Sequence, residues 1–180
     1  MKGSSLFMPL KKNTRPLKDM TRESIFNILT HSKKISFEIR KSNILDLYAG
    51  TGSFGLECIS RDAQKVSFVE KEKLAIKILK KNIEKLNAKK ESNIYFIDVF
   101  KFVKKKIINN YDLIFCDPPF KCDEINNLIK FIFINKFLKK NGILILHRNK
   151  GSKDDFPDHF YKIDERTYGI SKIIFGKFLL

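Results

Sequence analysis

Short apolar segments alternate along the chain with longer segments in which apolar residues recur every three or four positions. The short segments are rich in β-branched and aromatic residues, which is typical of buried strands; they cover residues 43–48, 65–70, 93–97, 111–116 and 142–147. The longer segments have helical spacing and cover residues 53–60, 72–86, 100–108 and 123–138. Strands that alternate with helices in this way predict an α/β fold with a mostly parallel sheet and helices on both faces.

The two ends of the chain depart from this alternation. Residues 1–18 predict an irregular basic arm, and a helix is expected to begin at Asp19. Near the other end, segments 159–168 and 170–179 predict an antiparallel hairpin that brings the sheet to seven strands. The sequence thus predicts a basic arm followed by one domain over residues 19–180.

Composition narrows the class of protein. With 180 residues and 43% hydrophobic content the chain can bury a core in one domain, and no apolar run approaches the roughly 20 residues of a membrane span. Cys58, Cys116 and Cys122 form no CxxC pair and have no metal-ligand spacing with any histidine. Because a secretory leader pattern is also missing, we expect a cytoplasmic protein with no metal site and no membrane partner.

Charge indicates the class of partner. Lys and Arg number 36 against 20 Asp and Glu, and the formal charge of +16 favours a polyanion, with nucleic acid as the first candidate. The basic residues occur along nearly the whole chain, however, so AT-rich coding, which favours Lys, Ile and Asn, accounts for the same charge. The lysines of segment 72–86 are likewise typical of an ordinary solvated helix face.

A glycine-rich turn marks a candidate cofactor site. Gly50, Gly52 and Gly55 form a GxGxxG pattern between a predicted strand and a predicted helix. Glycines at such a turn allow the backbone, including that of Ala49 and Thr51, to approach a bound ligand closely. The pattern by itself fits either a dinucleotide or S-adenosyl-L-methionine.

Acidic residues at the ends of the predicted strands favour the second cofactor. Asp46 would repel the pyrophosphate of a dinucleotide but attract the ammonium and sulfonium groups of S-adenosylmethionine. Glu70, about 20 residues beyond Gly50, can accept hydrogen bonds from the ribose hydroxyls of either cofactor. Asp98, which precedes Val99, can accept an adenine amino proton or cap the next helix, and the two roles can coexist.

A rigid proline corner supplies the candidate chemistry. Asp117-Pro118-Pro119-Phe120 follows the apolar segment 111–116, and its two prolines fix the backbone and remove two N–H donors. The Asp117 carboxylate and a main-chain carbonyl at Asp117 or Pro118 can hold the two N–H groups of an exocyclic base amine. Phe120 can stack on the base, and Asp117 can take the proton after methyl transfer.

Together these motifs resemble the RsmD family of small-subunit (16S) rRNA guanine-N2 methyltransferases, class I enzymes with a Rossmann-like domain. The resemblance covers nearly the whole chain. Its further family-specific residues are Asn13-Thr14-Arg15-Pro16, Asp19, Arg22-Glu23-Ser24-Ile25-Phe26 and Tyr168-Gly169. It implies that the glycine turn and the acidic strand ends bind S-adenosylmethionine and that Asp117 and Phe120 hold the target base. It also implies that Arg15 faces cofactor or RNA and that Arg22 contacts RNA.

The function implied by the resemblance is methylation of a guanine N2 amine in 16S rRNA or in a small-subunit assembly intermediate. We expect a monomer, although the sequence does not fix the oligomeric state. A methyltransferase acting on adenine N6 or cytosine N4 and a non-catalytic RNA-binding assembly factor are the alternatives. No segment is long enough for an added target-recognition region, and mere binding does not need the proline corner. His31, His147 and His159 lie outside the motifs and are expected to be structural or surface residues.

Overall fold

Helices and strands alternate along the chain as far as the fifth strand. The structure, a computed structural model, describes residues 5–8, 19–105 and 110–179. Its elements, in chain order, are α1 (Asp19–His31), β1 (Asn43–Leu47), α2 (Ser53–Ser60), β2 (Lys65–Glu70), α3 (Lys73–Lys85), β3 (Ser92–Phe96), α4 (Val99–Val103), β4 (Tyr111–Cys116), α5 (Ile125–Ile134), β5 (Leu138–Asn149), β6 (Phe160–Tyr168) and β7 (Ser171–Phe178). The predicted α/β fold with a closing hairpin is confirmed.

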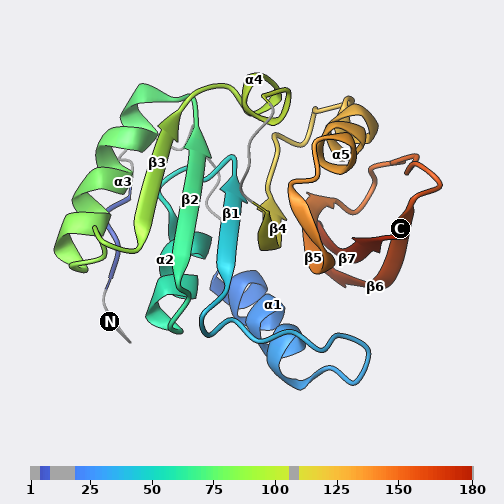
Figure 1. The fold of residues 1–180 in the computed structure, drawn as a ribbon, viewed down its shortest axis with the longest axis horizontal. Coiled ribbons are helices and arrows are strands. Elements are labelled where there is room, and N and C mark those ends of the chain that lie inside the picture. Colours follow the sequence, from blue (N-terminus) through green and yellow to red (C-terminus); the bar gives the residue numbers. More distant parts are fainter. Residues whose placement is uncertain (1–4, 9–18, 106–109, 180) are drawn as a thin grey trace.

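The strand order reverses between two central strands of the sheet. The seven strands follow the order β3-β2-β1-β4-β5-β7-β6, which can be traced in Figure 1. Strands β1 to β5 pair in parallel, whereas β7 is antiparallel to both β5 and β6. The chain progresses outward in one direction from β1 and in the other from β4, so the order reverses between these two strands. Open α/β sheets bind ligands at the carboxyl ends of strands beside such a reversal.

Helices cover both faces of the sheet, as predicted. Buried residues of α1, α2 and α3 form one core cluster with alternate strand residues such as Ile143 and Ile145. The intervening residues, such as Leu144 and Leu146, pack with α4 and α5 in a second cluster. This alternation follows from the side-chain period of two along a strand, and it decides which face each polar side chain at a strand end can reach.

Two predicted boundaries are wrong near β5. The helix predicted over 123–138 ends at Ile134, and the strand predicted over 142–147 begins earlier, at Leu138. Phe137 and Leu138 continue the helical spacing of the apolar residues beyond Asn135 and Lys136, so periodicity alone does not mark the junction. The helix predicted over 100–108 is α4, which ends earlier than predicted, at Val103; residues 106–108 lie outside those that the structure describes.

Three helices end in a backbone turn that has no glycine. After α5, Lys136 adopts a φ of 54° and the N–H of Phe137 donates to the carbonyl of Ile132 at 3.0 Å, which is a Schellman motif. Asp62 and Asn87 hold the same left-handed position after α2 and α3. Glycine is the usual residue there, and its absence removed the signal that would have ended the predicted helix at the correct residue.

We expect the stack of aromatic rings at the start of α2 to dominate local stability. Phe54 is 2% exposed and lies between Phe26 and Phe115, with ring centroids 5.2 and 4.0 Å away. Phe54→Ala should lower the free energy of unfolding by about 3–5 kcal/mol in urea denaturation. The matched control, Phe96→Ala, removes a ring that is 61% exposed and should change it by no more than about 0.5 kcal/mol. Equal losses for the two variants would contradict this account.

Candidate active site

Three carboxylates converge where the strand order reverses. Asp46 near the end of β1 is 1% exposed, and its Oδ2 accepts a hydrogen bond from the backbone N–H of Gly55 at 3.0 Å. Burial is the main cause that raises the pKa of Asp46 to about 8; the Gly55 bond opposes the shift, and the charges of Asp117 and Glu70 add to it. The surrounding protein therefore stabilises the charged form of this carboxyl group poorly, and a cationic ligand at the site would stabilise it better.

The glycine turn lies next to two of these carboxylates, Asp46 and Glu70. Gly50 and Gly52 have φ values of 55° and 85°, left-handed conformations that side chains rarely adopt. The N–H of Gly50 donates to Glu70 Oε2 at 2.8 Å, which ties the turn to the end of β2. A Cβ atom at Gly50 would meet nothing within 4 Å, so the turn faces open space. The N–H of Ala49 pairs with Val69 of β2, and Thr51 completes the turn.

Asp98 caps α4, so the helix-cap alternative for this residue is confirmed. Its Oδ1 accepts hydrogen bonds from the backbone N–H groups of Phe100 and Lys101 at 3.0 and 3.3 Å. Lys71 Nζ lies 3.2 Å from Oδ2. Burial opposes the shift, but the hydrogen bonds from Lys71 and from the helix backbone lower the pKa of Asp98. Val99 is buried in the core beside it.

A histidine that no motif identified, His147 on β5, lies beside the proline corner. His147 Nδ1 lies 2.7 Å from Asp117 Oδ1, and the His147 ring meets Phe120 edge-on with centroids 5.7 Å apart. The N–H of Asp117 donates to the carbonyl of Leu47 at 3.3 Å, which joins the corner to β1. The available signal was register: the apolar runs 111–116 and 142–147 belong to adjacent parallel strands, in which Cys116 pairs with Leu146, so the next residues, Asp117 and His147, lie side by side.

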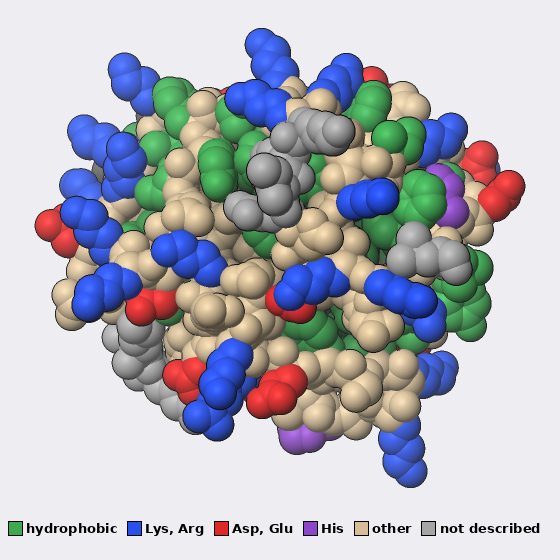
Figure 2. Space-filling view, viewed as in Figure 1, with side chains coloured by type: hydrophobic (Ala, Val, Ile, Leu, Met, Phe, Trp, Pro, Cys, Tyr) green, Lys and Arg blue, Asp and Glu red, His purple; other side chains and the backbone are tan. Residues whose placement is uncertain are grey.

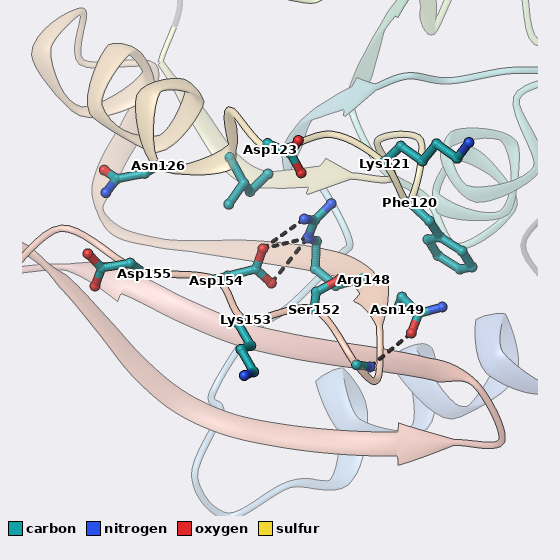
Figure 3. Close-up of a pocket in the computed structure, with 12 residues that line it drawn as sticks. Phe120, Lys121, Asp123, Asn126, Arg148, Asn149, Ser152, Lys153, Asp154 and Asp155 are labelled. Atoms are coloured by element: carbon teal, nitrogen blue, oxygen red, sulfur yellow. Dashed lines mark hydrogen bonds and ion pairs between the residues drawn. The ribbon is translucent and has the colours of Figure 1, made fainter.

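A cavity of about 590 Å³ opens beside Phe120 (Figure 3). It lies between the segment after β4 and the loop that follows β5. Its described lining includes Phe120, Lys121, Asp123, Asn126, Arg148, Asn149, Ser152, Lys153 and Asp155. Arg148 is fixed within it because its guanidinium donates to Asp154 at 2.7–3.1 Å and to the carbonyl of Cys122 at 2.9 Å. The lining carries both charge signs and several amides, which suits a polar, planar ligand better than a bare anion.

Comparison with known proteins assigns the family. The family described as Conserved hypothetical protein 95 matches residues 1–177. The ribosomal RNA small subunit methyltransferase D of Haemophilus influenzae is 31% identical over 94% of this chain and 86% of its own length. The protein of that name from Buchnera aphidicola of Baizongia pistaciae is 34% identical over 76% of this chain and 66% of its own length. The chain belongs to this family.

A solved structure agrees with that membership. A protein from Haemophilus influenzae assigned as a methylase is 29% identical to the chain and superposes with a TM-score of 0.76. The match covers 90% of this chain and 98% of the other.

Within the described ranges, no helix is long and apolar enough to cross a membrane. Across the same residues, no group of three or more His, Cys, Asp and Glu side chains could hold a metal ion.

In this family member, the described part of the predicted arm reaches the glycine turn. The amide of Asn82 on α3, which is fully buried, donates to the carbonyl of Thr51 at 3.0 Å and exchanges two hydrogen bonds with the backbone of Phe7. Met8 Sδ lies 3.9 Å from Thr51 Oγ1. Residues 5–8 thus pack on the domain. Sequence reasoning missed Asn82, because it stands in what reads as an ordinary helix position.

The predicted RNA-contacting arginines are placed only in part. Arg22 lies on α1 and pairs with Asp19 at 2.8 Å, with 24% of its side chain exposed. Arg15 lies outside the residues that the structure describes. Arg22 is therefore partly accessible, and the structure does not bring it together with the proline corner by any described contact.

The raised pKa of Asp46 predicts a specific dependence of stability on pH. Between about pH 4 and 8 the folded protein keeps a proton that the unfolded chain has released, so stability falls as pH rises. Asp46→Asn removes this effect, and its stability relative to the parent should grow by about 1 kcal/mol per pH unit from pH 5 to 7. Urea denaturation at several pH values measures it, with the exposed Asp62→Asn as the matched control. Parallel curves for the parent and Asp46→Asn would contradict the prediction.

Proposed function

We propose that the crevice between β1 and β4 binds S-adenosyl-L-methionine and that the protein methylates the exocyclic N2 amine of a guanine in 16S rRNA. Membership of the family supplies the reaction class: the protein is an rRNA methyltransferase. One observation carries the finer proposal. The N–H of Asp117 donates to the carbonyl of Leu47, the residue after Asp46, at 3.3 Å, so the proline corner lies beside the buried carboxylate under the glycine turn. The charge of Asp117 also helps to raise the pKa of Asp46. A cofactor held at the first would therefore stand beside an amine held at the second.

The residues at the crevice fit a cationic cofactor. Asp46 and Asp117 present carboxylates to its ammonium and sulfonium groups, and a bound cation would offset the unfavourable burial of Asp46. The open space at Gly50 leaves room for it. Glu70 would accept hydrogen bonds from the ribose, and Asp98, with Val99 behind it, from the adenine. When bound, S-adenosylmethionine supplies an electrophilic methyl group.

The proline corner positions the nucleophile. The lone pair of an exocyclic amine is delocalised into the base, so the amine must be held and oriented before it can react. The Asp117 carboxylate and the main-chain carbonyl at Asp117 or Pro118 accept its two N–H groups, and Phe120 stacks on the base. As the amine nitrogen gains the methyl group it loses a proton, which the Asp117 carboxylate accepts.

The target base of the RNA must be exposed to enter the proline corner. A base within a helix is inaccessible, so the target guanine must be unstacked in a loop or junction. Figure 2 shows Lys and Arg spread over the visible face, in keeping with many weak phosphate contacts and not with one deep basic groove. The cavity beside Phe120 has room for a nucleotide next to the target, and Arg15 and Arg22 would contact the strand further away. We propose a cytoplasmic monomer that acts on 16S rRNA or on a small-subunit assembly intermediate.

Asp117→Asn should separate cofactor binding from chemistry. The amide keeps the shape of the carboxylate but accepts a proton poorly, so we expect kcat to fall by about 10²–10⁴-fold. Calorimetry should still detect S-adenosylmethionine, with a lower affinity because one of the two carboxylates that face its cationic groups is lost, and NAD should not bind to either the variant or the parent. Asp62→Asn, at an exposed turn, is the matched control and should keep full activity. Retained turnover in Asp117→Asn would remove this residue from the mechanism, and NAD binding in place of S-adenosylmethionine would overturn the cofactor proposal.

The nature of the target base can be read from cellular rRNA. In cells lacking the protein, mass spectrometry of nucleosides from 16S rRNA should show the loss of one N2-methylguanosine. The parent gene should restore the modification, whereas the Asp117→Asn gene should not. Loss of a methylated adenosine or cytidine instead would replace guanine as the target, and an unchanged profile would favour the non-catalytic assembly factor.

A further inference from the structure

We infer that His147 is a positioning residue for the proline corner: its imidazole donates from Nδ1 to Asp117 Oδ1 and so fixes the carboxylate that holds the base amine. This inference rests on the proposed function, because it assigns a role within that same site. No sequence motif identified His147 as a site residue.

The contact is built into the register of the sheet. In the parallel pairing of β4 with β5, Cys116 lies opposite Leu146. The next position along each strand brings Asp117 beside His147, although 30 residues separate them in the sequence. Both side chains point to the face covered by α1, α2 and α3, because Phe115 and Ile145, two positions earlier, pack in that cluster. Two rigid central strands therefore hold the pair at 2.7 Å.

Burial selects the protonation state of the pair. The His147 side chain is 6% exposed, and its Nε2 atom is buried without a hydrogen-bond partner among the described residues. A proton on Nε2 would leave an unpaired buried N–H group, which is rare and unfavourable in proteins. With the proton on Nδ1 instead, the imidazole donates to an ionised carboxylate, and Nε2 keeps only a lone pair. The geometry thus favours a proton on Nδ1, which donates to Asp117, and an Asp117 carboxylate that acts as the acceptor.

This arrangement divides the two carboxylate oxygens between two tasks. His147 occupies Oδ1, so Oδ2 is the oxygen that faces the amine and receives its proton. The amine nitrogen forms its bond to the methyl carbon as the sulfur–methyl bond breaks, and the proton lost from nitrogen passes to Oδ2. His147 keeps its own proton throughout. Its ring also contacts Phe120 at its edge, so one imidazole supports both the acceptor and the stacking surface.

Three substitutions at one position separate hydrogen bonding from packing. In His147→Asn the amide nitrogen stands in the place of Nδ1, so kcat for methylation of 16S rRNA should stay within about 3-fold of the parent. His147→Phe keeps a ring beside Phe120 but has no donor, and kcat should fall about 10–100-fold with KM for S-adenosylmethionine changed by less than about 3-fold. In His147→Gln the amide lies one bond too far out, so the loss should match that of His147→Phe. Thermal unfolding of each variant reports its fold.

A double variant tests whether His147 acts through Asp117. If it does, adding His147→Phe to Asp117→Asn should lower kcat by less than about 3-fold further, because the effects of residues that act as a unit do not multiply. A full further 10–100-fold loss would overturn the inference. So would an unchanged kcat in His147→Phe, or losses in folded His147→Asn as large as in His147→Phe. A parent protein with no methyl transfer to RNA would instead reject the proposed function, so the two failures are distinguishable.

Discussion

The in-register parallel pairing of β1, β4 and β5 is the constraint on which the site depends. Asp46 pairs with Phe115 across β1 and β4, and Cys116 pairs with Leu146 across β4 and β5. A shift of one residue in either pairing would turn the polar strand ends to the opposite face of the sheet. The glycine turn, the proline corner and the histidine beside it are therefore placed by the same backbone hydrogen bonds that hold the centre of the fold.

This placement concentrates negative charge in a buried region. A carboxyl group with the environment of Asp46 opposes folding at neutral pH, since it must either lose its charge or keep it away from water. Glu70, in the same part of the sheet, is instead satisfied by the backbone N–H groups of Gly50, Lys71 and Glu72. The poorly compensated group lies where a cationic ligand would sit, which is the pattern expected when stability is given up for binding.

Much of the fold was predictable from the sequence because its strands are continuous apolar runs and its two motifs are local. The boundaries of β2, β4 and α2 agree with the predicted ones. The errors near β5 arose because Lys136 occupies a left-handed turn position without a local signal. His147 and the Arg148–Asp154 pair were missed for a different reason: each depends on which strand or loop lies alongside, and a pattern along one chain segment does not contain that information.

The buried amide of Asn82 has a consequence for how the start of the chain relates to ligand binding. It joins the backbone of Phe7 to the carbonyl of Thr51, so a stretch near the first residue and the turn that faces the crevice share one set of hydrogen bonds. Displacing residues 5–8 would remove the bonds that hold Asn82 against the glycine turn, and a change in the shape of the turn would weaken the contact with residues 5–8. A ligand bound at the glycine turn and the described residues 5–8 would thus be coupled through one amide, although Asn82 and Phe7 stand 75 positions apart in the sequence.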